Sequence, residues 1–152
     1  MNEQLLKMNG LSVEILNALS FESHLGISLK KNLHYFDKDL LIAELMTMTD
    51  WLDEQEVLSD IALDYRVKSL DAILLKYDRY YPNHQTRKVF NDILGFRAFC
   101  DSYDQALKEE ASGFRIADMS NGKSLDDGYR GVHVYYQKSG KHYPIEIQFN
   151  TL

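Results

Sequence analysis

Two short segments near the end of the chain alternate between apolar and polar residues, and this pattern constrains the fold most strongly. The segments run from Val132 to Gln137 and from Tyr143 to Phe149. A period of two is typical of a β-strand that buries one face. The intervening Lys138-Ser139-Gly140-Lys141 is suited to a turn. The sequence therefore predicts a hairpin with one face in the core and a polar opposite face.

The register of this hairpin depends on where the turn lies. A two-residue turn at Ser139-Gly140 would place His133 opposite Glu146 and Gly131 opposite Gln148. Paired residues point to the same face, so His133, Glu146 and Gln148 are expected together on the polar face. The core face would carry five apolar side chains: Val132, Val134, Ile145, Ile147 and Phe149. A polar face that only meets solvent would give a similar pattern.

Helices are expected in the first part of the chain. Apolar residues are concentrated from Leu11 to Leu19, and Leu41, Leu45, Met48 and Leu52 recur at helical spacing. Ser69 is a suitable cap for a helix over about 70–80, which ends before Pro82.

The remaining segments alternate between strands and a helix. Strands are predicted over 90–100 and 114–119, a helix over 101–110, and a loop over 120–128. The order predicts an α+β fold, with a mixed or antiparallel sheet flanked by helices. We expect an N-terminal helical segment, 1–64, that packs on the rest of the chain, 65–152.

Charge is distributed unevenly along the 152 residues. The net charge is −6, yet residues 1–65 hold four Lys or Arg against twelve Asp or Glu, and residues 66–152 hold thirteen against eleven. A general nucleic-acid-binding protein would show a broad basic face. The second part is instead compatible with a local cationic pocket for one polyanionic small molecule.

The bulk features indicate a cytoplasmic protein with no membrane partner. Cys100 is the one cysteine, so no internal disulfide can form, and its place at the end of an apolar run predicts a buried structural thiol. No apolar run reaches the length of a membrane span. The N-terminus lacks the basic region and apolar block of a signal peptide.

Candidate site residues gather in four segments. Asp92 and Glu146 are candidate ligands of Mg²⁺, which binds through few carboxylates and through substrate phosphates. Arg66, Lys68 and Lys76 surround the start of the predicted helix, where cations favour phosphate. Each has an alternative reading, because an Asp can cap a turn and cations can cover a solvated helix surface.

Tyr129 lies between Gly128 and Arg130 at a junction of loop and strand. An aromatic ring there can stack on a nucleobase, which contributes about 1–3 kcal/mol in nucleic-acid sites. A tyrosine packed into the structure is the alternative, since the chain has ten tyrosines.

Four segments together resemble the synthetase domain of the RelA/SpoT family, which makes guanosine tetra- and pentaphosphate alarmones. The resemblance covers residues 65–151 and is closest to the small, synthetase-only members. The segments are Arg66-Val67-Lys68-Ser69 with Lys76, Asp92-Ile93-Leu94-Gly95-Phe96-Arg97, Gly128-Tyr129-Arg130-Gly131-Val132-His133, and Glu146-Ile147-Gln148-Phe149-Asn150-Thr151.

The resemblance implies transfer of pyrophosphate from ATP to the 3′-hydroxyl of GDP or GTP. It implies that Asp92 and Glu146 bind Mg²⁺ and act in catalysis, with Glu146 as a general base for the attacking hydroxyl. By position, the ATP-binding cations are Arg66, Lys68, Lys76 and Arg97. The acceptor-binding residues are Tyr129, which stacks on guanine, with His133, Gln148 and Lys123.

The sequence departs from the family pattern mainly in the acceptor loop. Leu125 stands where a phosphate-binding lysine is usual, so Lys123 is the candidate replacement, and Asp126 and Asp127 would repel a phosphate. Two alternatives therefore stay open. One is a toxin-type relative that pyrophosphorylates the 3′ end of tRNA, and the other is a catalytically inactive nucleotide-binding module.

The resemblance also bears on the extent and assembly of the chain. The family domain continues into further helices after the last motif, whereas this sequence ends at Leu152. We therefore expect the synthetase domain to be incomplete at its C-terminus. Family relatives form dimers or tetramers, which makes a homo-oligomer the expectation.

Overall fold

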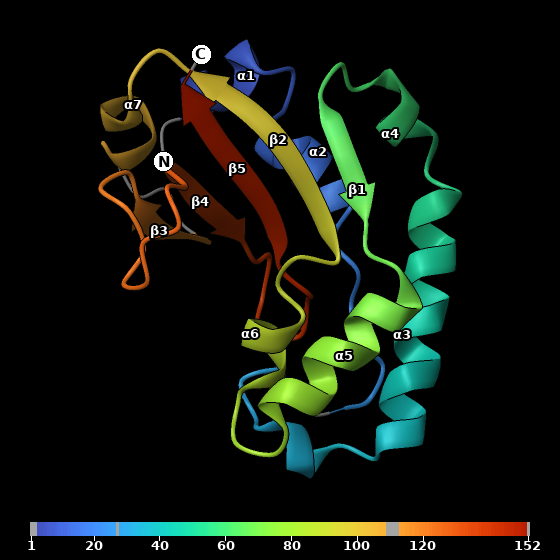
Figure 1. Cartoon of the computed structure of the whole chain (residues 1–152). Helices are drawn as coiled ribbons and strands as arrows, with labels where there is room; N and C mark the ends of the chain where they lie inside the picture. The colour runs from blue at the N-terminus through green and yellow to red at the C-terminus, as the bar shows by residue number, and fades with distance from the viewer. Residues whose placement is uncertain (1–2, 27, 109–112, 152) are drawn as a thin grey trace.

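The computed structural model describes residues 3–26, 28–108 and 113–151, and it shows helices around one mixed sheet (Figure 1). The sheet has five strands in the order β1-β2-β5-β4-β3. Parallel pairing is confined to β2 and β5, and the other neighbours are antiparallel. The predicted α+β fold is confirmed. The strands are β1 (Asp64–Val67), β2 (Leu94–Cys100), β3 (Phe114–Met119), β4 (Gly131–Tyr136) and β5 (Ile145–Thr151).

Helices cover the first part of the chain and separate the strands. Those before the sheet are α1 (Glu3–Met8), α2 (Val13–Ala18), the 3₁₀ helix η1 (Leu33–Tyr35), α3 (Lys38–Asp53) and α4 (Glu56–Asp60). Between strands lie α5 (Leu70–Tyr80), α6 (Thr86–Val89) and α7 (Tyr103–Leu107). The helix expected over 70–80 is confirmed, and its predicted cap is in place because the Ser69 side chain accepts from the Ala72 N–H.

The two faces of the sheet differ as the alternation predicts. Apolar side chains of β2, β4 and β5 lie on the inner face and are almost fully buried: Leu94, Phe96, Ala98, Val132, Val134, Ile145, Ile147 and Phe149. They share one core with leucines of the N-terminal helices, including Leu6 and Leu16, and with Leu41 and Leu45 of α3. Cys100 is also buried, as expected for a structural thiol.

The predicted hairpin register is wrong by two residues. His133 lies opposite Gln148 instead of Glu146, and Glu146 lies opposite Tyr135. The last pair before the connection is Tyr136 with Ile145, so residues 137–144 replace the predicted two-residue turn. An even shift keeps every side chain on its predicted face, so His133, Glu146 and Gln148 still share the polar face.

Long-range contacts explain why the connection is longer than a tight turn. The Ser23 N–H donates to the Lys141 carbonyl at 2.7 Å, and the Tyr143 N–H donates to the Phe21 carbonyl at 3.0 Å. Within the loop, the Gln137 side chain donates to the His142 carbonyl. These bonds replace the strand pairing that a two-residue turn would have continued.

Some predicted boundaries also differ. The strand expected from residue 90 begins at Leu94, because α6 ends at Val89 and Phe90 is its C-cap. The helix expected over 101–110 spans Tyr103–Leu107, and its predicted end at Glu110 lies outside the described residues. The short strand β1 was not predicted.

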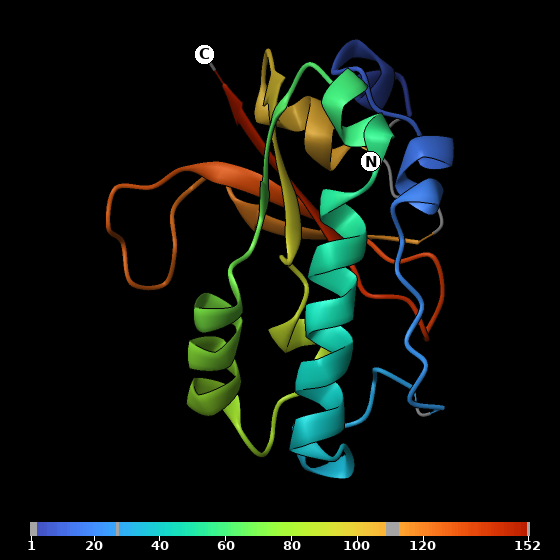
Figure 2. The ribbon, with the colours of Figure 1, turned by 90° about the vertical axis from the view of Figure 1, so that its right-hand side faces the viewer.

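The arrangement of the helices leaves the polar face of the sheet accessible beside α5 and α6. Helices α1 and α2 lie behind the sheet in the view of Figure 1, while α5 and α6 lie beyond the edge where β2 and β5 begin. Figure 2 shows α3 standing beside α5, to which it is linked by a Lys38–Asp78 ion pair at 3.7 Å. Among the described residues, no helix has the length and apolar character needed to cross a membrane.

Candidate functional site

Two adjacent rows of residues cross the polar face of the sheet and form the candidate site. Strand pairing puts the first row in the order Arg66, Gly95, Glu146, Tyr135 and Arg115, one residue from each strand. The second row, displaced by two residues, is Asp64, Arg97, Gln148, His133 and Ala117. Neighbouring strands are about 4.8 Å apart. The sheet therefore aligns cations, carboxylates and an imidazole from segments far apart in the sequence.

A cavity of about 290 Å³ opens on the β1 side of these rows. Both predicted metal-binding carboxylates, Asp92 and Glu146, line it together with Arg66 and Arg97. Gln148 is also in its wall. Five of the residues predicted from sequence are therefore brought to one cavity, with the carboxylates and guanidinium groups facing a shared space.

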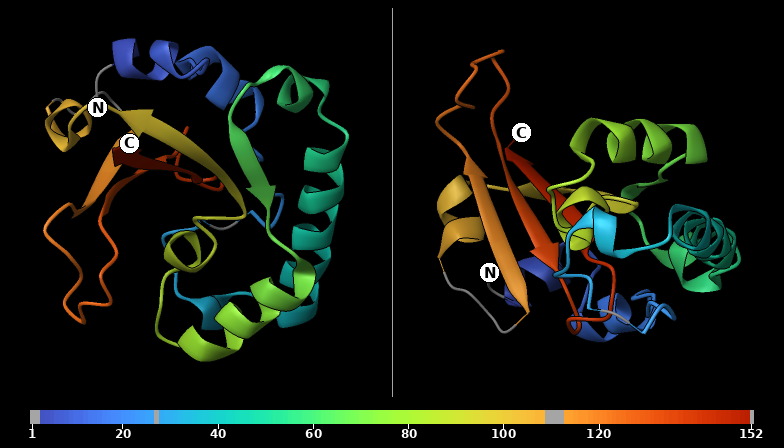
Figure 3. Two further views of the ribbon diagram at one scale, coloured as in Figure 1. Left: turned by 45° about the horizontal axis from the view of Figure 1, so that its top comes forward. Right: turned by 90° about the horizontal axis from the view of Figure 1, so that it is seen from below.

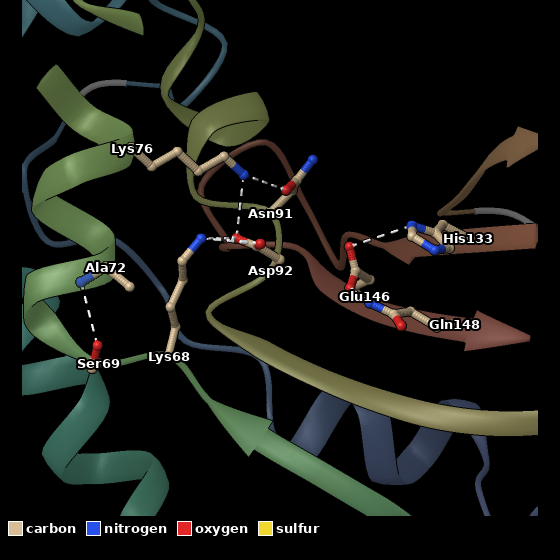
Figure 4. A network of polar contacts seen from close by, with 9 residues as sticks. All are labelled: Lys68, Ser69, Ala72, Lys76, Asn91, Asp92, His133, Glu146 and Gln148. Carbon is tan, nitrogen blue, oxygen red and sulfur yellow. Dashed lines mark hydrogen bonds and ion pairs between the residues drawn. The ribbon is translucent and has the colours of Figure 1, made fainter. Parts of the chain in front are cut away.

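Asp92 lies two residues before β2, so strand alternation does not decide the direction of its side chain relative to Arg97. Its carboxylate accepts from the Lys68 ammonium at 3.1 Å and from the Lys76 ammonium at 3.3 Å. The three side chains are only 12–21% exposed. Lys68 is fixed by its own N–H, which donates to the Ile93 carbonyl at 2.7 Å. Lys68 and Lys76, both predicted to bind ATP, thus contact Asp92, the predicted metal ligand (Figure 4).

Glu146 is 6% exposed and is held by its neighbours on the polar face. The Gln148 amide donates to Glu146 Oε1 at 2.6 Å, and His133 Nδ1 lies 3.8 Å from Oε2 (Figure 4). Strand pairing places Tyr135 beside Glu146, and its hydroxyl interacts with this carboxylate. Burial, and then the negative charge of Glu146, raise the pKa of Tyr135, which therefore stays a neutral donor.

His133 connects Glu146 to the predicted base-stacking tyrosine. The Tyr129 hydroxyl and His133 Nε2 are 2.8 Å apart, and the two rings meet edge-on with centroids 5.7 Å apart. Burial lowers the pKa of His133, and the charge of Glu146 opposes this shift. The neutral imidazole is therefore favoured; it is hydrogen-bonded to Tyr129 and lies 3.8 Å from the Glu146 carboxylate.

The loop between β3 and β4 projects from the body of the protein (Figure 3) and carries its own ion pairs. Lys123 lies 5.0 Å from the centre of the Tyr129 ring and pairs with Asp127 at 3.3 Å. Arg130 pairs with Asp126 at 2.9 Å. The hydrogen bond from Arg130 lowers the pKa of Asp126, and the Tyr129 N–H does the same for Asp127. Both carboxylates that should repel a phosphate are thus already engaged by cations or backbone donors.

Tyr135 was not among the predicted site residues, although the sequence carries a signal for it. Tyr135 follows His133 by two residues in the same strand, so strand alternation places both on the polar face. The predicted register paired Glu146 with His133, so it gave no reason to expect a contact between Tyr135 and Glu146. Strand pairing instead places Tyr135 beside Glu146.

Three carboxylates line the cavity, because Asp64 of β1 is in its wall together with Asp92 and Glu146. Within residues 3–26, 28–108 and 113–151, no cluster of three or more His, Cys, Asp or Glu side chains is arranged to hold a metal ion. Asp92 and Glu146 are hard oxygen donors that line one cavity beside guanidinium groups. This set fits Mg²⁺ only if phosphate oxygens supply further ligands.

Comparisons with known proteins found similar chains among solved structures. No protein-family model matches the chain, and no curated protein matches it. Small alarmone synthetase 1 from Bacillus subtilis, bound to its product pppGpp, is 28% identical with a TM-score of 0.42, over 74% of this chain and 65% of that chain. The same protein bound to AMPCPP is 25% identical with a TM-score of 0.37, over 76% and 70%.

A protein from Streptococcus mutans is 23% identical with a TM-score of 0.41, over 74% of this chain and 66% of that chain. The matched region thus spans about two thirds of the length of these structures. Over about three quarters of its own length, the chain is similar to small alarmone synthetases.

Proposed function

We propose that the protein is a pyrophosphotransferase that moves the β,γ-pyrophosphate of ATP to the 3′-hydroxyl of GDP or GTP and so makes (p)ppGpp. The observation that carries this proposal is the cavity in which Asp92 and Glu146 face Arg66 and Arg97. Phosphoryl-type transfer depends mainly on positioning and on neutralising charge. A pair of carboxylates for a metal, set among cations for phosphates, supplies both.

The donor side of the cavity has two cations ready for a ligand. Among the described residues, neither Arg66 nor Arg97 forms an ion pair with a carboxylate, whereas Lys68 and Lys76 both contact Asp92. Guanidinium groups bind phosphate through two parallel hydrogen bonds and can also stack on a base. Arg66 and Arg97 are therefore the proposed first contacts for ATP.

Mg²⁺ would be held by Asp92 and Glu146 together with ATP phosphate oxygens. When bound, the ion would neutralise charge on the transferred group. Lys68 and Lys76 form ion pairs with Asp92 at 3.1 and 3.3 Å. With Asp92 neutralised by a metal, these ammonium groups would be available for the phosphates, as proposed from the sequence.

Glu146 is the proposed general base. It takes the proton of the acceptor 3′-hydroxyl, whose oxygen bonds to the β-phosphorus of ATP as the bond to the α-phosphate oxygen breaks and AMP leaves. The Gln148 and Tyr135 contacts hold the carboxylate in one orientation. Fixed orientation of a base within hydrogen-bond reach is the geometric requirement for such a step.

The proposed acceptor side consists of Tyr129, His133, Gln148 and Lys123. A guanine that stacks on Tyr129 would meet the ring beside Lys123, which now lies over it. Leu125 is 87% exposed on the same loop, at the position where the family pattern has a lysine. A tRNA 3′ end as acceptor, or nucleotide binding without catalysis, are the alternatives that the experiment must separate.

The test is a transfer assay with γ-labelled ATP and Mg²⁺, in which GDP, GTP and uncharged tRNA are offered separately. The proposal expects label on a guanosine nucleotide, released as 3′-pyrophosphate by mild hydrolysis. Transfer of label to tRNA and to neither guanosine nucleotide would show that the acceptor is the tRNA 3′ end instead of GDP or GTP. Binding of AMPCPP without transfer to any acceptor would favour the inactive module.

A further inference from the structure

A second cavity, of about 220 Å³, lies on the same face of the sheet at the β3 side. Arg87 and Lys88 of α6 and Arg115 of β3 line it, with Tyr135 and Gln137 of the β4 segment. Tyr135 and Arg115 belong to the row of residues that contains Glu146. We call this space the basic cavity.

The walls of the basic cavity are fixed by the backbone. The Arg87 N–H donates to the Leu29 carbonyl at 3.0 Å, and the buried Thr86 hydroxyl donates to the Lys31 carbonyl at 3.1 Å, so α6 is tied to the segment before α3. On the opposite wall, the Gln137 N–H donates to the Gly113 carbonyl at 2.8 Å. Gly113 has φ +88, and a Cβ there would lie 3.1 Å from the Gln137 carbonyl oxygen.

Like Arg66 and Arg97 of the first cavity, and unlike the lysines near Asp92, the cations of the basic cavity have no carboxylate partner among the described residues. Lys68 and Lys76 pair with Asp92, and the loop cations pair with acidic neighbours. In the part of the chain that the structure describes, Arg87, Lys88 and Arg115 form no ion pair. Arg115 lies 4.5 Å from the centre of the Tyr135 ring, which supports its guanidinium without neutralising it.

We propose that the basic cavity binds the 5′-phosphates of the nucleoside polyphosphate that accepts the transferred group. This inference rests on the proposed function, because it uses Glu146 as the reaction centre and Tyr129 as the base contact. Three cations around one space would bind a polyphosphate through charge-assisted hydrogen bonds. They would supply the positive charge that Leu125, Asp126 and Asp127 do not provide in the acceptor loop.

The order of groups along β4 supports this placement. Tyr129 folds back to His133 at 2.8 Å, His133 lies 3.8 Å from Glu146, and Tyr135 is the next residue on the same face. Residues two apart in a strand are separated by about 6.6 Å. A nucleotide laid along the strand would therefore place its base at Tyr129, its ribose hydroxyl near Glu146 and its 5′-phosphates at Arg115.

Calorimetric binding of GDP, guanosine and inorganic triphosphate tests the proposal. The variant is the double substitution Arg87→Gln with Arg115→Gln, and the matched control is Lys7→Gln with Lys141→Gln, which removes two exposed cations elsewhere. Charge-assisted contacts to phosphate are worth enough for roughly a ten- to hundredfold effect on affinity. We expect the wild type and the control to prefer GDP over guanosine by at least that factor and the double variant to lose most of this preference. The affinity of the double variant for inorganic triphosphate should fall by a similar factor.

Binding of AMPCPP with Mg²⁺ separates this inference from the proposed function. Its affinity should stay within about twofold in the double variant, because Arg87 and Arg115 do not line the donor cavity. A GDP preference that survives in the double variant, or falls equally in the control, overturns the inference and leaves the function standing. The inference is also overturned if a tRNA 3′ end binds while the wild type does not distinguish GDP from guanosine. Failure of AMPCPP to bind the wild type would instead count against the proposed function. In that case, if triphosphate binding is lost in the double variant and kept in the control, the basic cavity is still supported as a phosphate site.

Discussion

At the scale of single residues, Glu146 is a buried carboxylate whose orientation is fixed by its neighbours. Gln148 fixes one oxygen at 2.6 Å, while Tyr135 and His133 approach the same group from β4. A carboxylate that is 6% exposed would be costly without such donors. These neighbours offset the cost of burial and orient the carboxylate that we propose as the base.

Removal of the Tyr135 hydroxyl should slow the reaction without unfolding the protein. A hydrogen bond to a charged group is worth about 1.5–3 kcal/mol, so we expect Tyr135→Phe to lower kcat at least tenfold, with little change in the KM for ATP. Steady-state kinetics measure this. The control is Tyr136→Phe, whose hydroxyl contacts Asn17 instead of the site. An equal loss of kcat in both variants would contradict a role for Tyr135 in holding Glu146.

At the scale of elements, the β4–β5 connection decides the register of the site. The loop over 137–144 is tied to residues 21–23 and contains a contact of 2.6 Å between Ser139 Oγ and His142 Nδ1. Burial, followed by the charge of Lys138, lowers the pKa of His142, so its neutral form is favoured in the folded protein.

This shift predicts a pH dependence of stability. Because the folded-state pKa of His142 lies below the unfolded value of about 6.5, the unfolded chain binds more protons in that range. Stability is therefore full above pH 6.5 and falls as the pH drops through the lowered pKa. Urea unfolding at pH 7.5 and 5.5 should show a smaller decrease for His142→Asn than for the wild type. Equal decreases would contradict the contribution of His142.

The polar face could be predicted from sequence, but the register could not. Alternation assigns His133, Glu146 and Gln148 to one side whatever the length of the turn, because an even shift preserves the face. The partner of each residue depends on the bonds from residues 21–23, which are more than a hundred positions away. No local pattern encodes these bonds.

The unpredicted strand β1 and the missed Tyr135 have related causes. Three of the four residues of β1 are exposed, so the strand lacks the apolar alternation by which strands are recognised. It forms because pairing with β2 satisfies its backbone and brings Arg66 beside Gly95. Tyr135 required the correct strand partner before its contact with Glu146 could be seen.

At the scale of the whole molecule, a buried polar cluster joins the N-terminal part to the sheet. Glu44 of α3 accepts from the Ser23 hydroxyl at 2.8 Å and from the Tyr143 hydroxyl at 2.6 Å. Leucines from both parts share the core around it. We therefore propose that residues 1–64 and 65–152 unfold together, although the domain boundary at residue 64 stays a prediction.

Loss of the Tyr143 hydroxyl should destabilise the entire chain. Tyr143→Phe leaves the buried Glu44 with one donor fewer, which costs about 1–3 kcal/mol of the free energy of unfolding. Urea unfolding followed by both circular dichroism and tryptophan fluorescence measures the loss, since Trp51 lies in α3. The control is Tyr35→Phe, at a ring that is 56% exposed. Separate transitions for the two probes would contradict joint unfolding.

The central claim is that Glu146, facing Asp92 across the arginine-lined cavity, is the base for pyrophosphate transfer. The most direct measurement is the single-turnover rate of label transfer from γ-labelled ATP to GDP for the wild type and for Glu146→Gln, with Glu56→Gln as an exposed control. Loss of a general base is expected to slow transfer by about 10²–10⁴-fold, while AMPCPP binding persists and the control reacts at the wild-type rate. Transfer by Glu146→Gln at the wild-type rate would contradict the account.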